Sequence, residues 1–179
     1  SFLRPLGLRL KVFTVSAALE ENLVTPNTHF FCDGYQTIAG YNVKCTAFQK
    51  GGHGDLALDE TLMVSCNDAM MQIAARMGTE SFLKAQTLFN FGSRTGIDLP
   101  NEGSGVIHTT DTMGETELAC SAFGQGFTCT MLQEISAMCS VINGGYYYQP
   151  HLVTAIKDSS GGTVRTIDPV LLKQTISSD

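Results

Sequence analysis

Lys11 is the residue whose setting first suggests chemistry, because it is a cation at the start of an otherwise apolar segment. Apolar residues recur at helical spacing from Lys11 to about Leu23, and Pro26 is expected to end the helix. A lysine in the first turn of such a helix either extends its amine to solvent or exchanges a proton with a partner one turn earlier. The residue one turn earlier is Leu8, which has no group that can exchange a proton.

A serine three residues before a lysine occurs at Ser81 and Lys84, and this pair could be mistaken for a nucleophile and its base. The pair lies in the middle of "TESFLKAQTLFNFG", residues 79–92, which predicts an amphipathic helix ended by Gly92. No helix N-terminus is expected at the serine, and a match of this length arises readily by chance. We therefore predict that Ser81 and Lys84 lie on the surface without a catalytic role.

The segments before this helix predict a helical pair preceded by an irregular region. "LDETLMVSCNDAMMQIAARMG", residues 58–78, predicts two helices that are joined at Ser65 to Asn67 and end at Gly78. Residues 29–56 are rich in glycine, aromatic and β-branched residues, which is typical of short strands and turns.

The C-terminal half continues the helical pattern. A helix is expected near "DTMGETELACSAFG" and is broken by "GQG" at 124–126, and Thr130 is expected to cap a long apolar helix that lies in the core. "HLVTAIKDSSGGTVRTIDP" alternates around a Ser-Gly-Gly turn and predicts a β-hairpin. Together these patterns predict an α+β chain that is mainly helical.

Length, composition and charge limit the possible classes of protein. The chain has 179 residues, 43% of them hydrophobic, which suits one domain with its own core. Its net charge of -6 comes from 17 acidic and 11 basic residues spread along the sequence, without the basic stripe that a nucleic acid needs, so no nucleic-acid partner is expected. The sequence shows neither an apolar run long enough to cross a bilayer nor a signal peptide, and a soluble chain is expected.

The six cysteines form no Cys-x-x-Cys motif, and no cysteine and histidine stand at the spacing of a zinc motif, so neither a metal nor a cofactor is predicted. Cys32 and Cys45 flank a hairpin-like stretch, and either a disulfide between them or two free thiols is compatible with the sequence. His53, His108 and His151 are expected in loops, where they are solvated or locally bonded.

Five segments occur in an order that identifies a family: "KVFTVSAALEENLVTPNT", "SCN", "TGIDLP", "SAFGQGF" and "INGGYYYQPHLV". In this order they closely resemble the transpeptidase domain of class B penicillin-binding proteins, the cell-division and sporulation type, from about Lys11 to the end of the chain. The resemblance implies a partial penicillin-binding transpeptidase fold of the serine β-lactamase-like type. It supplies mainly helices and one hairpin, without the strands around the family's third motif.

Members of this family cross-link peptidoglycan stem peptides by acyl transfer through a serine, and β-lactams acylate the same serine. The resemblance assigns Lys11 to the lysine of the first motif, Ser-x-x-Lys, in which the amine takes the proton of the serine hydroxyl. It assigns Ser65 and Asn67 to the second motif, Ser-x-Asn, where the serine relays a proton and the asparagine holds the substrate amide. The third motif, Lys-Ser/Thr-Gly, does not occur in this sequence.

The first motif lacks its nucleophile. The family's "PGSTFK" is replaced by "LGLRLK", with Leu8 where the serine belongs, so the chain is predicted to be inactive. Codons for Pro5 to Lys11 can be chosen so that a neighbouring reading frame encodes Pro-Gly-Ser-Thr-Phe. We therefore predict that residues 1–10 are non-native and that residues 1–179 form a single incomplete transpeptidase domain.

Two further expectations follow from the resemblance. The parent protein is expected to be membrane-anchored and extracytoplasmic, and the incomplete domain is expected to form a homodimer because helices without their sheet expose apolar surface. The alternative to an enzyme fragment is a non-catalytic pseudoenzyme, acting as a sensor or binding module that kept the fold and lost the nucleophile.

Overall fold

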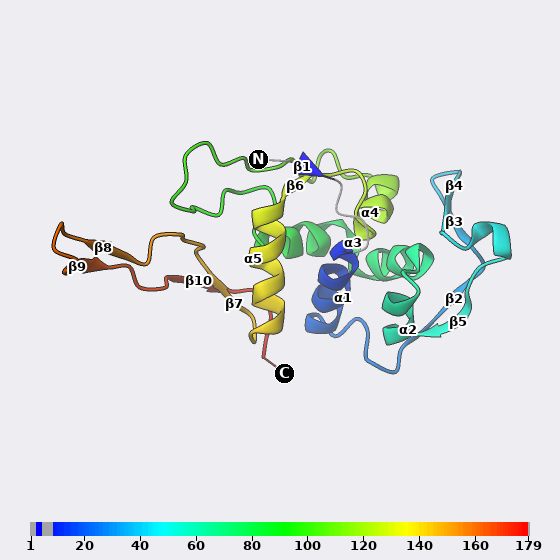
Figure 1. The fold of residues 1–179 in the computed structure, drawn as a ribbon. Helices are drawn as coiled ribbons and strands as arrows, with labels where there is room; N and C mark the ends of the chain where they lie inside the picture. Colours follow the sequence, from blue (N-terminus) through cyan, green and yellow to red (C-terminus); the bar gives the residue numbers. More distant parts are fainter. Residues whose placement is uncertain (1–2, 5–8, 179) are drawn as a thin grey trace.

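The computed structural model describes residues 3–4 and 9–178, with side chains from residue 9 onward, so Leu8 lies outside the described residues. A cluster of helices forms the centre of the molecule (Figure 1). The helices are α1 (Leu10–Glu20), α2 (Leu58–Met63), α3 (Asn67–Leu88), α4 (Glu115–Ala122) and α5 (Met131–Ile142). The first helix ends at Glu20, three residues before the predicted end, and Asn22 then adopts a left-handed φ of 57°.

Helices α1, α3 and α4 pack together around aromatic and small side chains. The ring of Phe13 from α1 lies 5.0 Å from that of Phe89 and 5.1 Å from that of Phe91, and all three residues are buried. The hydroxyl of Thr14 donates a 2.9 Å hydrogen bond to the carbonyl of Ala122 at the end of α4. These contacts fix α1, which carries Lys11, against α3 and α4.

The strands form antiparallel pairs rather than one sheet. Among the described residues each sheet has two strands. The pairs are β1 (Leu3–Arg4) with β6 (Cys129–Thr130), β2 (His29–Cys32) with β5 (Gly54–Ala57), β3 (Tyr35–Ile38) with β4 (Tyr41–Lys44), β7 (Tyr146–Tyr148) with β10 (Leu171–Gln174), and β8 (Ala155–Lys157) with β9 (Thr163–Thr166). A 3-10 helix, η2 (Phe48–Lys50), lies between β4 and β5.

The strand pairs lie at the periphery of the helical cluster (Figure 1). Pairs β2–β5 and β3–β4 form a lobe beside α2 and the start of α3, as the composition of residues 29–56 predicted. The predicted hairpin is β8–β9, which projects from the opposite side of the molecule. The hairpin-like stretch between Cys32 and Cys45 forms a second hairpin, β3–β4. Pairs β1–β6 and β7–β10 were not predicted, because strands of two to four residues give too little alternation to be recognised.

Two breaks interrupt the helices where the sequence predicted them. Helices α2 and α3 are separate, and Ser65 between them has a left-handed φ of 53°. Gly78 has φ 75° and ψ 169°, so α3 is kinked there rather than continuous. A glycine adopts this conformation without the steric cost that a Cβ would impose.

Helix α5 departs from the prediction that its apolar stripe lies in the core. Its N-terminus is capped as expected, since the Thr130 side chain accepts a hydrogen bond from the backbone N–H of Gln133. However, Gln133 is buried, whereas Met131, Ile135 and Ile142 are 53%, 54% and 77% exposed. The helix therefore presents an apolar face that no described residue covers.

Within residues 3–4 and 9–178, the helices are all too short or too polar to span a lipid bilayer.

Candidate active site

The amine of Lys11 lies at the centre of a hydrogen-bonded cluster between α1 and the junction of α2 and α3. Its Nζ donates to the carbonyl oxygen of Ser65 at 2.7 Å, to Ser65 Oγ at 2.7 Å and to Asn67 Oδ1 at 2.6 Å. Lys11 is 2% exposed, so it does not extend to solvent. The structure thus brings together the three residues that the sequence predicted, although 54 to 56 positions separate them in the chain.

The backbone between α2 and α3 presents both oxygens of Ser65 to the lysine. The N–H of Ser65 donates to the carbonyl of Leu62 at 3.1 Å, and the N–H of Cys66 donates to that of Thr61 at 2.8 Å. These bonds close the end of α2 while Ser65 takes its left-handed φ, which is uncommon for a residue other than glycine. Strained residues of this kind often occur at functional sites.

The start of α3 is held in place by a buried carboxylate next to the candidate site. Asp68 is fully buried, and its Oδ1 accepts hydrogen bonds from Gln36 Nε2 at 2.7 Å and Gln72 Nε2 at 2.8 Å. Gln72 also donates to the carbonyl of Phe31 at 2.8 Å. The first turn of α3, which begins with Asn67, is therefore tied to β2 and β3.

Burial lowers the pKa of the Lys11 amine, while the neighbouring thiols of Cys45 and Cys66 act in the opposite direction. Removing a charged amine from water disfavours the protonated form, which is how proteins convert lysine into a base. The protonated amine has three N–H donors for its three acceptors. The neutral amine keeps two donors and gains a lone pair, which can accept a proton from a hydroxyl.

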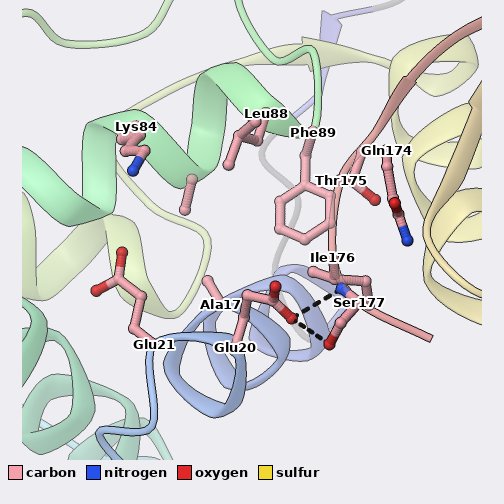
Figure 2. A pocket seen from close by; sticks show the side chains of 11 residues that line it. Ala17, Glu20, Glu21, Lys84, Leu88, Phe89, Gln174, Thr175, Ile176 and Ser177 are labelled. Atoms are coloured by element: carbon pink, nitrogen blue, oxygen red, sulfur yellow. Dashed lines mark hydrogen bonds between the residues drawn. The ribbon is translucent and has the colours of Figure 1, made fainter. Parts of the chain in front are cut away.

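A pocket of about 360 Å³ lies elsewhere, between the end of α1, the second half of α3 and the C-terminal segment (Figure 2). Ser177 closes one side of it, because its N–H and Oγ each donate to Glu20 Oε2 at 2.8 Å. Lys84 lines this pocket and is exposed, and Ser81 is half-buried. Lys11 is not among the residues that line this pocket.

Ser81 follows the break at Gly78 by three residues and lies near the start of a helical segment, so the expectation that no helix N-terminus lies there was wrong. That Ser81 and Lys84 have no catalytic role stays a prediction.

Three of the cysteines and His53 lie closer together than their spacing in the sequence indicated. Cys32, Cys45, His53 and Cys66 converge so that their ligand atoms all lie within 4.8 Å of one another, and they could hold a metal ion. Sequence reasoning missed this group because the residues follow no zinc motif, and His53 was expected to have no ligand partner. The available signal was that three of the six cysteines and one histidine lie between positions 32 and 66.

The cysteines of this cluster have altered acidities. All six cysteines of the chain are free thiols in the structure, including Cys32 and Cys45. Burial by itself raises the pKa of Cys45, but backbone N–H groups, above all that of Ala47, outweigh burial and lower the pKa to about 7. Burial raises the pKa of Cys66 and that of Cys32.

Comparison with known proteins identifies the family. The sequence model of the family described as penicillin binding protein transpeptidase domain matches residues 10–179, and the chain belongs to this family. Stage V sporulation protein D of Bacillus subtilis is 34% identical over 175 residues, which are 97% of this chain and 27% of that protein. Peptidoglycan D,D-transpeptidase MrdA of Haemophilus influenzae is 31% identical over 164 residues, which are 86% of this chain and 25% of that protein.

Solved structures show the same fold. Penicillin binding protein 3 of Mycobacterium tuberculosis, complexed with aztreonam, has a TM-score of 0.88 at 23% identity, over 99% of this chain and 39% of that chain. A putative peptidoglycan glycosyltransferase from Atopobium parvulum has a TM-score of 0.84 at 27% identity, over 99% of this chain and 40% of that chain. The partial α+β transpeptidase fold predicted from the sequence is therefore confirmed, and the chain spans about a quarter of the length of the curated relatives it matches.

Proposed function

We propose that this chain carries the proton-handling part of the active site of a peptidoglycan D,D-transpeptidase, which works by acyl transfer to a serine. The observation that carries the proposal is the contact of Lys11 Nζ with Ser65 Oγ at 2.7 Å and Asn67 Oδ1 at 2.6 Å. A buried lysine, a serine and an asparagine within hydrogen-bonding distance form a path for a proton. The family match over residues 10–179 supports this assignment.

Each of the three residues has a defined task in this proposal. Neutral Lys11 takes the proton of a serine hydroxyl one helical turn earlier, and that oxygen attacks the carbonyl of the stem peptide. Ser65 passes a proton from the lysine toward the leaving amine. Asn67 uses Oδ1 to bind Lys11, which leaves its Nδ2 group to donate to a carbonyl of the substrate.

The chain as it stands lacks the atom that would receive the acyl group. Position 8 is leucine, and a leucine side chain forms no ester. We propose that a shifted reading frame over residues 1–10 puts Leu8 in place of the serine, because codons for Pro5 to Lys11 can be chosen so that a neighbouring frame encodes Pro-Gly-Ser-Thr-Phe. Resequencing the locus tests this explanation, and seven in-frame codons for Pro5 to Lys11 without a neighbouring insertion or deletion would refute it.

Covalent labelling with a fluorescent penicillin tests the proposed chemistry. The present chain should show no label that survives denaturation, whereas Leu8→Ser placed in the complete open reading frame should be labelled. In that background, Lys11→Met and Ser65→Ala should each reduce the labelling rate by at least about 100-fold. The control Ser81→Ala should label at the full rate. A labelled peptide that contains Ser65 or Ser81 would show that the three residues have been given the wrong tasks.

The leucine at position 8 also supports a second candidate, a pseudoenzyme that binds cell-wall peptides or β-lactams without reacting with them. A complete open reading frame that encodes Leu8 together with an intact third motif would favour it. Reversible binding of a β-lactam, without a covalent label, would then be expected.

The parent protein is proposed to be membrane-anchored, with this domain facing the cell wall.

A further inference from the structure

A groove of about 590 Å³ lies between β3, the first half of α3 and the start of α4 (Figure 1). Its volume is that of a site for a small molecule or a short peptide. The buried side chains of Met71 and Leu118 line it, together with the exposed charged side chains of Arg76 and Glu115. Lys11 does not line the groove, which is therefore separate from the candidate active site.

Two glutamine side chains that line the groove have a fixed orientation. Gln36 Nε2 and Gln72 Nε2 each donate to Asp68 Oδ1, at 2.7 and 2.8 Å. A carboxylate oxygen is an acceptor, so the amide nitrogens face Asp68 and the two Oε1 atoms point the other way. Neither Oε1 atom accepts a hydrogen bond from a residue that the structure describes. Both are therefore available to the N–H groups of a ligand.

Strand β3 presents an unpaired backbone edge to the groove. Among the described residues it pairs only with β4, through a two-residue turn at 39–40 whose φ angles of 49° and 82° are both left-handed. In such a hairpin the pair next to the turn is hydrogen-bonded, and the following pair, Thr37 with Asn42, is not. The N–H and C=O of Thr37 therefore point away from β4. Thr37 lines the groove, so an extended peptide can form two backbone hydrogen bonds with it.

The side chains of the groove fit a peptide that has a free amine. The Glu115 carboxylate attracts an ammonium group, and the two glutamine carbonyls are further acceptors for its N–H donors. The guanidinium of Arg76 lies 4.7 Å from the centre of the Phe30 ring, a cation–π contact that holds it ready for a carboxylate. Ala75 and Ala119 also line the groove, and their size leaves room for small side chains of a ligand.

We propose that this groove binds an extended peptide with a free amine and small side chains, which adds to the edge of β3. The backbone of Thr37 holds the peptide, and Glu115 binds its ammonium group. In a peptidoglycan transpeptidase, the peptide with this chemistry is a stem peptide that has not yet been cross-linked. This identity of the peptide rests on the function proposed above, whereas the groove itself does not.

The groove is connected to the candidate active site through Asp68. The two glutamines of the groove hold Asp68, which directly follows Asn67, and Asn67 accepts a hydrogen bond from Lys11 at 2.6 Å. Asp68 is fully buried, and its Oδ2 makes no hydrogen bond to a described residue, so its carboxylate depends on the two glutamines. A ligand that binds these glutamines changes the hydrogen bonding of Asp68 and with it the position of Asn67. A free stem peptide in the groove would thus adjust the orientation of Asn67.

NMR titration of the ¹⁵N-labelled 179-residue protein with the tripeptide Lys-D-Ala-D-Ala tests the groove. This peptide has free amines and small side chains, and its Nα,Nε-diacetyl derivative lacks both amines. The free tripeptide should shift the backbone amide signal of Thr37 and the side-chain amide signals of Gln36 and Gln72. The diacetyl derivative should bind about 3- to 10-fold more weakly, because it has no ammonium group for Glu115.

Two variants of the groove have matched controls. Thr37→Pro removes an N–H that β4 does not use, and it should weaken binding by about 3- to 10-fold. Thr37→Val keeps this N–H and should bind like the parent. Glu115→Gln should weaken binding of the free tripeptide by about 3- to 10-fold and leave that of the diacetyl derivative unchanged. Glu117→Gln removes a nearby carboxylate that does not line the groove, and it should bind like the parent.

The connection to Asn67 has a readout of its own. At a saturating concentration the tripeptide should shift the side-chain amide signal of Asn67 in the parent protein. Gln36→Met removes one of the two donors to Asp68 and should reduce this shift. Because Glu115 is exposed, Glu115→Gln tests the groove even if Thr37→Pro does not fold.

Three results would overturn the groove as a peptide site. They are no binding of the tripeptide at about 10 mM, equal binding of its diacetyl derivative, and binding that neither Thr37→Pro nor Glu115→Gln weakens. These results are distinct from a failure of acyl transfer, which is measured by penicillin labelling in the Leu8→Ser background. Labelling without peptide binding would refute the groove alone, and binding without labelling would refute only the acyl transfer.

Discussion

Replacing Lys11 by methionine tests whether the buried network exists as described. Methionine has a similar length and stays apolar, so it fills much of the same space while removing the amine. The change leaves three acceptors, two on Ser65 and one on Asn67, without their donor. We expect Lys11→Met to destabilise the fold.

The size of the effect follows from the three bonds and their exposure. Each hydrogen bond to a charged group contributes about 1.5–3 kcal/mol, but burying the amine costs free energy that methionine does not incur. Ser65 and Asn67 are half-buried, so water replaces part of what is lost. The net expectation is a loss of about 2 kcal/mol, which corresponds to a fall in Tm of roughly 4 to 8 °C for a domain of this size.

The pH dependence of this difference has a definite sign. Burial lowers the pKa of Lys11 in the folded chain below its ordinary value of 10.5. Between the lowered pKa and 10.5 the unfolded chain therefore binds more protons at Lys11 than the folded chain does, so the stability that Lys11 contributes rises with pH across this window. The methionine side chain does not titrate. The difference in free energy of unfolding between the parent chain and Lys11→Met should therefore increase as the pH rises.

Urea unfolding, followed by circular dichroism at pH 7 and at higher pH values, measures this difference in free energy of unfolding. Lys84→Met is the matched control, because Lys84 is exposed, and it should change the free energy of unfolding by less than about 0.5 kcal/mol. A Lys11→Met protein as stable as the control would refute the buried network. A difference in free energy of unfolding that decreases at high pH would refute the claim that burial lowers the pKa of Lys11.

Two further changes test the core and the uncovered surface. Phe13→Ala should cost about 3–5 kcal/mol in urea unfolding, because it removes a buried ring that packs on Phe89 and Phe91 at 5.0 and 5.1 Å, and a loss below 1 kcal/mol would contradict the packing of α1. The parent chain should sediment as a dimer or larger assembly at micromolar concentration, because α5 exposes Ile135 by 54% on its apolar face. Ile135→Glu should shift the distribution toward a single chain, and a parent that already sediments near 19.3 kDa would exclude this association.

The helices could be predicted from the sequence, because each has a strong local signal. Apolar spacing identified α1, the positions of Ser65 and Gly78 marked the breaks around α3, and Thr130 marked the start of α5. The prediction that was wrong concerned which side chains of α5 are buried. The apolar stripe of α5 was assigned to the core, but a helix pattern shows which face is apolar and not what lies against it.

The candidate site was predictable only in part, because local sequence patterns do not show which distant residues come into contact. Lys11, Ser65 and Asn67 were found because motifs of a known family mark them, although they are far apart in the chain. The cluster of Cys32, His53 and their partners has no such motif. It depends on the pairing of β2 with β5 and on the loop around Gly52, which are tertiary features that ligand spacing does not reveal.

The long separation between Lys11 and Ser65 has a consequence for folding kinetics. Their contact closes a loop of 54 residues, whose entropic cost is roughly 3.5 kcal/mol beyond a constant, from (3/2)RT ln n. Local helix formation cannot offset this cost, so the contact should form only once α1 has docked on α3. Until that late step the amine remains in water and keeps its proton. The lowered pKa of Lys11 therefore appears only together with the native state.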